Sequence, residues 1–287
     1  MSTSRGSPAT PCPIPAIKPA PDGFTDSLPP WSLEAESWWI LSAAPLPWQT
    51  KQLPQGALDI REDSKLQEFE ATYKGGLGTL QLTRYYSSPI GPYEELLYIP
   101  GKMSYKVGGT SISGLSITRI YVSSFAALLN GRRIWNTPKH LARFEFTPEK
   151  PSDPHSPTVI SVYPSLSDSP TPEFSPDPMF RVRMVSSRYM PRVPLNLSKF
   201  PRALFDSKVL QPPLNHPIGT EKWITVEVGN RGYVRVVYPE PGLEGSRYGD
   251  GIRCPDFKPT NFGLWCPKLH QIFPPPEILD FGSKKTD

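Results

Sequence analysis

The sequence is poor in the residues that hold metal ions. It has three cysteines (Cys12, Cys254 and Cys266) and four histidines among 287 residues. Neither set shows the spacing of a zinc site, and an odd number of widely separated cysteines is typical of reduced thiols rather than of a disulfide framework. We therefore expect no metal centre and no disulfide scaffold.

Clustered charge and long apolar runs are also missing. Thirty-one Lys and Arg residues against 27 Asp and Glu leave a net charge of +4, with no basic cluster interleaved with aromatic residues. This balance argues against a nucleic-acid partner, because binding to a phosphate backbone needs concentrated positive charge. No apolar run approaches the length of a membrane span, and residues 1–6 lead into Pro- and Ser-rich sequence without the apolar core of a signal peptide. We expect a cytoplasmic protein with no membrane partner.

Proline, by contrast, is abundant. The 38 prolines argue against a helical protein, because a proline inside a helix removes a hydrogen bond and clashes with the preceding turn. With 37% hydrophobic residues, the chain is long enough for one large β-rich domain or two small ones. Residues 1–30 contain too few apolar residues for their burial to offset the conformational entropy lost on ordering. We therefore expect them to form a disordered tail. A Pro-rich loop is expected at about residues 150–178, interrupted by a short strand at residues 159–163.

Alternation of apolar and polar residues predicts several β-strands. It is clear at residues 78–86, where Leu80 and Leu82 alternate with polar residues, and at residues 180–185; apolar stretches predict further strands at residues 31–41 and 95–99. Residues 223–228 and 233–238 flank the sequence GNRG, whose residues tolerate positive φ, and this arrangement predicts a hairpin.

The segment from Gly131 to Phe146, GRRIWNTPKHLARFEF, contains a lysine that follows a conformationally restricted backbone and precedes apolar residues. Pro138 fixes its own φ and disfavours the helical region for the preceding residue, so few conformations lead into Lys139. Alternation from residue 141 to residue 146 places Lys139 at the entrance of a strand. Before it, a short helix is expected at residues 125–129, with Ser123 or Ser124 as its N-cap and Gly131 at its C′ position. Taken alone, Lys139 would be expected at the surface, because lysine is seldom buried.

This segment resembles the lysine motif of the acetoacetate decarboxylase family. Members of the family carry Gly-Arg-Glu, an aromatic residue a few positions on, and Pro-Lys-Lys-Leu. The matching residues here are Gly131-Arg132-Arg133, Trp135 and Pro138-Lys139-His140-Leu141. A second segment, residues 91–101 (GPYEELLYIPG), resembles the family's Gly-Pro-Tyr signature, which carries an acidic residue before an apolar strand. The resemblance is strong from residue 76 to residue 146, and by it the chain is identified as a divergent, fungal-type member with Pro-Lys-His in place of Pro-Lys-Lys.

The resemblance implies a mostly β fold, an antiparallel cone-shaped β-barrel that forms a single domain over residues 31–287. It implies that Lys139 is a Schiff-base nucleophile, that Glu95 transfers protons or orients the imine, and that His140 replaces the family's second lysine. The candidate substrate contacts are Tyr93, Glu94, Arg119, Trp135 and Arg143, with Glu94 also the runner-up for the role of Glu95. The resemblance implies no cofactor, a small-molecule keto substrate as partner, and homo-oligomers as in known relatives.

Two departures from the family's pattern bear on the chemistry. A Schiff-base lysine must be neutral to attack a ketone, whereas a model lysine has a pKa of about 10.4, so burial or a neighbouring cation must favour the neutral amine. In the family, the second lysine is regarded as that cation. Here His140 takes its position, so burial, or the charge of Arg132, Arg133 or Arg143, would have to favour the neutral amine. The family also uses an arginine near the N-terminus toward the substrate carboxylate, but residues 31–39 contain two glutamates and no arginine. This favours a larger ketone or β-keto acid over acetoacetate, such as a polyketide-derived intermediate of secondary metabolism.

Three functions remain open from the sequence. The first is a lyase, most simply a decarboxylase, although relatives also run aldolase-dehydratase chemistry through the same lysine. The second is a non-catalytic barrel that binds a hydrophobic small molecule. The third is a cyclase or hydrolase that uses Glu95 and His140 as acid and base without a covalent step. The three differ in whether Lys139 becomes covalently attached to the ligand.

Overall fold

The computed structural model of the chain describes residues 20–42, 52–153, 155–167, 169–187, 189–197, 207–215 and 218–281. Over these residues the protein is mostly β, and no helix among them is both long and apolar enough to span a lipid bilayer. The elements up to the lysine motif are β1 (Trp31–Ser42), η1 (Ile60–Glu62), α1 (Asp63–Glu68), β2 (Thr72–Gly75), β3 (Gly78–Ser87), β4 (Tyr93–Ile99), β5 (Lys102–Val107), β6 (Thr110–Leu115), β7 (Arg119–Val122), α2 (Phe125–Trp135) and β8 (Lys139–Pro148). Those that follow are β9 (Thr158–Pro164), β10 (Phe180–Ser186), β11 (Val193–Asn196), β12 (Lys208–Gln211), β13 (Trp223–Glu227), β14 (Gly229–Pro241), β15 (Pro259–Phe273) and β16 (Glu277–Leu279).

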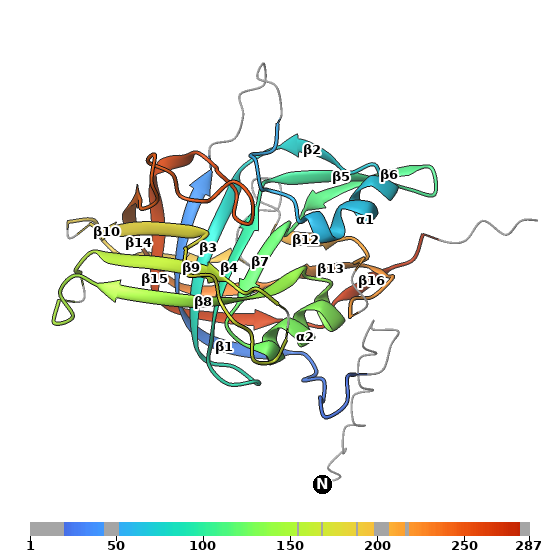
Figure 1. Cartoon of the computed structure of the whole chain (residues 1–287), viewed down its shortest axis with the longest axis horizontal. Coiled ribbons are helices and arrows are strands. Elements are labelled where there is room, and N and C mark those ends of the chain that lie inside the picture. Colours follow the sequence, from blue (N-terminus) through green and yellow to red (C-terminus); the bar gives the residue numbers. More distant parts are fainter. Residues whose placement is uncertain are drawn as a thin grey trace, which may run out of the picture.

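Ten strands form one sheet in the order β10-β9-β8-β7-β4-β3-β1-β15-β14-β11. An additional pairing of β10 with β14 closes nine of them into a β-barrel, and β11 is attached to β14. The ring is antiparallel except between β7 and β8, which are parallel because α2 connects them. The remaining strands form a second sheet, β16-β13-β12-β6-β5-β2, which lies beside the barrel with α1 (Figure 1). The predicted fold class, a mostly antiparallel barrel in a single domain, is confirmed.

Both faces of the barrel strands near the lysine motif are covered. One apolar cluster contains side chains from all nine strands of the ring and therefore fills the barrel; on β3 it includes Leu80 and Leu82. Successive side chains on a strand alternate, so the intervening residues of β3 point to the opposite face. There α2, β12 and β13 supply a second cluster, with Leu128, Ile134 and Val226 among its members.

Several predicted strands are present, but one predicted pairing is wrong. Residues 31–41, 78–86, 95–99, 159–163 and 180–185 fall in β1, β3, β4, β9 and β10. The hairpin predicted at residues 223–238 does not form, because β13 pairs with β12 and β16 in the second sheet whereas β14 pairs with strands of the first. The supposed turn is the first part of β14. Gly232 serves close packing there, since a Cβ would lie 2.4 Å from the carbonyl oxygen of Lys268.

Helix α2 is longer than predicted. The side chain of Ser124 caps its N-terminus by accepting a hydrogen bond from the backbone N–H of Ala127. The prediction of Gly131 as the C′ residue is wrong, because Gly131 lies inside the helix. The left-handed residue that ends the helix is Asn136, with φ 49° and ψ 34°, a conformation that asparagine tolerates better than most residues.

Residues 20–30, which the sequence assigns to the tail, are held against α2. The Asp26 carboxylate accepts two hydrogen bonds from the Arg133 guanidinium, both at 2.7 Å. The backbone N–H of Ser27 donates to Oδ1 of Asn130 at 2.8 Å, and Phe24 packs against the second cluster. The packed part of the chain therefore begins before the expected boundary at residue 30, while residues 1–19 lie outside the described ranges.

We expect Asp26→Asn to destabilise the fold by about 3 kcal/mol, because the buried Arg133 would lose the carboxylate that neutralises it. Urea unfolding followed by tryptophan fluorescence measures this change. Asp22→Asn, at an exposed position of the same segment, is the matched control and should change the free energy of unfolding by less than about 0.5 kcal/mol. Equal effects of the two substitutions would contradict the role of the Asp26–Arg133 pair.

Candidate active site

The turn between α2 and β8 is held from several sides. Nε2 of Gln211 donates to the backbone oxygen of Asn136 at 3.0 Å, and the Asn136 side chain bonds to two backbone groups of the segment before β13. The backbone N–H of Thr137 donates a hydrogen bond to the carbonyl oxygen of Gly131 at 3.1 Å. Lys139 follows as the first residue of β8, so its backbone position is set by this turn.

Gly131 makes room for the lysine side chain. A Cβ at this position would lie 2.4 Å from Cδ and 2.6 Å from Cε of Lys139, and 2.7 Å from Oγ1 of Thr137. The aliphatic stem of Lys139 therefore packs against bare helix backbone, which only glycine permits. The amine that it carries meets a side chain of β4, two strands away in the ring.

The Lys139 amine contacts the carboxylate of Glu95 in the protein interior. Nζ donates to Oε2 at 2.8 Å, and the two side chains are 8% and 3% exposed. The Tyr85 hydroxyl donates to the other carboxylate oxygen at 3.2 Å, and the Tyr93 ring centroid lies 5.6 Å from Nζ. Burial, and then the charge of Glu95, raise the pKa of both phenols well above the usual value. Both phenols therefore stay protonated at neutral pH, and Tyr85 remains a donor to Glu95.

These side chains line a cavity of about 510 Å³, a volume within the range of small-molecule sites. Most of the lining is apolar, and Trp31, Trp39 and Trp135 contribute aromatic surface. Among the described residues that line it, Lys139 and Glu95 are the only charged ones. A ligand in this cavity would meet one amine and one carboxylate on a largely hydrocarbon wall.

The predicted site residues divide into two groups. Those that line the cavity are Lys139, Glu95, Tyr93 and Trp135. Those outside its lining are His140, Glu94, Arg119 and Arg143. For His140 and Glu94 the division follows the strand period, because the residues next to Lys139 and Glu95 point to the opposite face of the sheet. Arg143 has the same parity as Lys139 but lies four residues further along β8.

His140 and Glu94 are engaged elsewhere. Nε2 of His140 contacts Oδ2 of Asp59, and its Nδ1 lies 3.0 Å from a terminal nitrogen of Arg61. Glu94 accepts a hydrogen bond from Ser123 at 2.6 Å. Glu95 and His140 therefore lie on opposite faces of the sheet and share no cavity.

The arginines that the sequence suggests as neighbouring cations are bound to carboxylates. Their ion pairs are Arg132–Glu62, Arg133–Asp26 and Arg143–Glu145. Arg119 forms an ion pair with Asp59 at 3.6 Å and also donates to the backbone oxygens of Gly56 and Ile252, at 2.9 and 2.8 Å. None of these guanidinium groups lines the cavity, so its charge balance rests on Lys139 and Glu95 within the described part of the lining.

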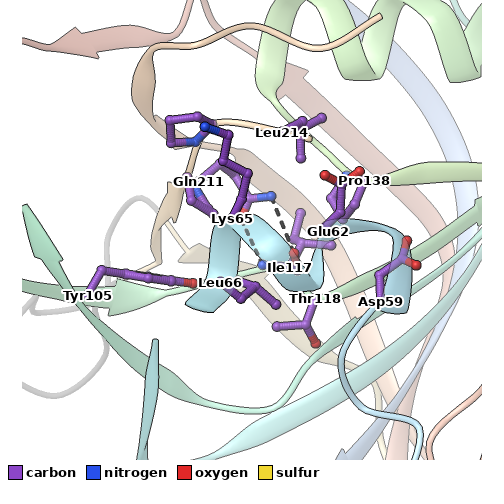
Figure 2. A pocket seen from close by; sticks show the side chains of 12 residues that line it. Asp59, Glu62, Lys65, Leu66, Tyr105, Ile117, Thr118, Pro138, Gln211 and Leu214 are labelled. Atoms are coloured by element: carbon purple, nitrogen blue, oxygen red, sulfur yellow. Dashed lines mark hydrogen bonds between the residues drawn. The ribbon is translucent and has the colours of Figure 1, made fainter. Parts of the chain in front are cut away.

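A second, small pocket lies behind the lysine turn, with Asp59, Glu62 and Pro138 around it (Figure 2). Its volume is about 20 Å³, which holds one water molecule and no organic ligand. Ile117 lines both the pocket and the large cavity and helps to separate them. Gln211 bonds to the backbone of Ile117 at 2.9 Å, so the same side chain supports this wall and the lysine turn.

The pKa of Asp59 predicts a loss of stability in acid. Burial raises this pKa, but the hydrogen bond to His140 and the positive charge of His140 and Arg119 outweigh it and lower the pKa from 3.8 to about 2. Because the folded-state pKa is the lower one, the stabilisation is complete above pH about 4 and is lost as the pH falls toward 2. It amounts to about 2 kcal/mol.

Urea unfolding at a series of pH values through this window measures the loss. Asp59→Asn should remove this part of the acid dependence, whereas Asp256→Asn, at an exposed position, should retain it. The same acid dependence in the wild type and in Asp59→Asn would contradict the assignment.

The sequence does not predict the other polar residues that line the cavity, among them Tyr85, Thr137 and Gln271. Tyr85 lies directly opposite Tyr93 in the pairing of β3 with β4, so the strand period beside the Gly-Pro-Tyr motif was an available signal. Thr137 is two residues from Lys139, and its place before Pro138 indicates only the conformation of its backbone. Gln271 lies in β15, far from both motifs, and no local pattern marks it.

Comparison with known proteins gives a fold and no family. No family model matches the sequence, and a search of curated proteins finds no match. Two solved structures are similar over most of the chain. One is the crystal structure of acetoacetate decarboxylase from Legionella pneumophila, with 13% identity, a TM-score of 0.49, and coverage of 92% of this chain and 93% of that chain. The other comes from structural studies of acetoacetate decarboxylase, with 11% identity, a TM-score of 0.51, and coverage of 92% of this chain and 96% of that chain. At such identities the second likeness shows an acetoacetate decarboxylase-like fold and nothing finer.

Proposed function

We propose that the protein is a lyase in which Lys139 forms a Schiff base with a keto substrate. The observation that carries the proposal is the buried 2.8 Å contact between the Lys139 amine and the Glu95 carboxylate in the wall of a largely apolar cavity. A buried ion pair adds little to stability, because desolvation of the two charges offsets their attraction. Proton transfer to and from a ligand gives such a pair a function.

The covalent step uses the two groups in turn. Glu95 accepts a proton from the Lys139 ammonium, and the neutral amine attacks the ketone carbon. The nitrogen proton moves to the former carbonyl oxygen, which gives a carbinolamine. Glu95 then protonates the hydroxyl, water leaves, and an iminium ion remains beside the Glu95 carboxylate.

The favoured reaction is decarboxylation of a β-keto acid. The bond to the carboxylate breaks, its electron pair moves toward the iminium nitrogen, and CO₂ leaves. The enamine takes up one proton from solvent at carbon, and water hydrolyses the iminium to release a ketone and free Lys139. The acetoacetate decarboxylase-like fold supports this reaction class, and a cavity of about 510 Å³ favours a substrate larger than acetoacetate.

Exchange of the carbonyl oxygen tests this proposal. Iminium formation expels the ketone oxygen as water, and hydrolysis replaces it with oxygen from solvent. In water enriched in oxygen-18, the protein should therefore label the ketone product, or an added ketone, faster than the uncatalysed hydration does. CO₂ release from a panel of β-keto acids identifies the reaction. Turnover without accelerated exchange would contradict a Schiff base.

A non-catalytic barrel that binds a hydrophobic molecule remains the second candidate, because most of the cavity lining is apolar. This candidate predicts ligand binding with neither CO₂ release nor oxygen exchange. A cyclase or hydrolase that pairs Glu95 with His140 has no geometric support, since His140 contacts Asp59 on the opposite face of the sheet.

Gly131→Ala should impair the site without unfolding the protein. The new methyl group would displace the Lys139 stem, and a misplacement of about 1 Å can cost about 10²-fold in rate. Helix propensity favours alanine over glycine by about 1 kcal/mol, which offsets part of the strain. We expect turnover to fall by about 10–10²-fold while the protein stays folded by circular dichroism.

Ala126→Gly, on the same helix, is the control for this prediction. It should lower stability by about 1 kcal/mol and leave turnover unchanged. Full activity of Gly131→Ala would show that Gly131 does not position Lys139.

A further inference from the structure

Several residues that line the large cavity carry a buried polar atom that no protein group satisfies. Six buried side-chain nitrogen or oxygen atoms in the described part of the chain have no hydrogen-bond partner, and three of them belong to cavity residues. They are Oγ1 of Thr79, Oγ1 of Thr137 and Oε1 of Gln271. Buried polar groups are nearly always paired in folded proteins, because an unsatisfied one loses its hydration without compensation. Their gathering at one cavity points to a ligand that completes them.

Gln271 is the most informative of the three, because its orientation is fixed. Nδ2 of Asn230 donates to the backbone oxygen of Val228 at 3.2 Å, which turns Oδ1 of Asn230 toward Gln271. Nε2 of Gln271 donates to this oxygen at 2.6 Å. The remaining amide oxygen of Gln271 can only accept, and the residue is 5% exposed and lines the cavity.

Gln271 lies away from the lysine pair. It belongs to β15, whereas Glu95 belongs to β4, three strand-to-strand steps along the sheet. At about 4.8 Å a step this is roughly 14 Å along the sheet, before the inward reach of the side chains. Two aromatic residues of the lining lie near Gln271: Phe273 is two residues further along β15, and Trp31 on β1 pairs with Phe273.

We infer that Gln271 determines substrate specificity by accepting a hydrogen bond from a hydroxyl group at the end of a bulky, otherwise apolar ketone whose carbonyl lies at Lys139. This inference rests on the proposed function for the position of the carbonyl, and on the unpaired Gln271 oxygen for the hydroxyl. An apolar ligand that fills the cavity leaves this acceptor buried and unpaired, whereas a hydroxylated one satisfies it. The substrate class is therefore a ketone or β-keto acid that carries a hydroxylated aryl or polycyclic group, rather than a short keto acid.

Two pairs of aryl ketones test the inference. Benzylacetone is compared with its para-hydroxy derivative, and the naphthyl analogue of benzylacetone with the same compound hydroxylated at the far end of the ring. Dissociation constants come from quenching of tryptophan fluorescence, since Trp31, Trp39 and Trp135 line the cavity. This readout needs no covalent step, and borohydride trapping on Lys139 is measured separately with the same ketones.

The hydroxyl should tighten binding by up to about tenfold in at least one pair, the value of one good hydrogen bond. Gln271→Met, which keeps the length of the side chain and removes the acceptor, should abolish this preference. Gln81→Met, at a polar cavity position on β3, is the matched control and should keep it.

Equal affinities within both pairs for the wild type, or no binding of any of the four ketones, would overturn the inference. So would a hydroxyl preference that survives in Gln271→Met or is lost in Gln81→Met. A Gln271-dependent preference without any adduct on Lys139 would support the specificity site and contradict the Schiff base. An adduct on Lys139 without a hydroxyl preference would support the Schiff base and contradict the specificity site.

Discussion

Replacing Lys139 by methionine is expected to abolish adduct formation and to lower turnover by about 10³-fold or more, the scale seen when a covalent nucleophile is removed. Methionine keeps much of the stem that packs against Gly131 and removes the amine, so the change tests the nitrogen rather than the packing. Turnover of the best β-keto acid and oxygen exchange of a ketone are measured side by side, and both should be lost.

The control for this substitution is Lys106→Met. The Lys106 side chain is 60% exposed on β5 in a surface ion pair, which contributes little to stability. Its replacement should leave both activities at the wild-type level. Turnover that persists in Lys139→Met would mean that the lysine binds the ligand without reacting with it.

Replacing Glu95 by glutamine is expected to lower turnover by about 10²–10⁴-fold, the usual contribution of a positioned acid or base. Glutamine can still accept the Tyr85 hydrogen bond, but it cannot exchange a proton with Lys139. Water can replace Glu95 as the acceptor of the Lys139 proton, so attack should continue at a lower rate and some borohydride adduct should still form. The measured signature is a large loss of turnover with a smaller loss of trapping.

Glu94→Gln is a closely matched control, because it makes the same chemical change one residue away. Glu94 lies outside the cavity lining and bonds to Ser123, so turnover should stay within about twofold of the wild type. Comparable losses in the two variants would remove Glu95 from its proposed role and return Glu94, the alternative from the sequence, to consideration.

The local half of the site could be predicted from sequence. The restricted backbone before Lys139 and the resemblance of two ordered motifs together predict Tyr93, Glu95 and Lys139 as site residues, and all three line one cavity. Strand alternation also separates neighbours on β8 and β4 onto opposite faces. Applied to residue 140, the same period would have excluded His140 from the cavity.

The remaining features depend on pairings that local patterns do not determine. Gly229 and Gly232 have the composition of a turn, yet they lie in a strand because β14 joins the barrel while β13 joins the second sheet. The polar face of β3 looks solvent-exposed by alternation, but other elements cover it, and Tyr85 becomes part of the site. The Arg132 guanidinium is likewise paired with the carboxylate of Glu62, 70 positions earlier in the chain.

The central claim is that Lys139 forms a covalent imine, and borohydride trapping tests it most directly, because the reagent reduces an iminium irreversibly. The protein is incubated with β-keto acids and ketones plus borohydride, digested, and analysed by mass spectrometry. We predict that the peptide containing Lys139 gains the mass of the ketone less one oxygen, and that Lys139→Met gains none. Turnover of an identified substrate with no adduct on that peptide, and with activity retained in Lys139→Met, would contradict the claim.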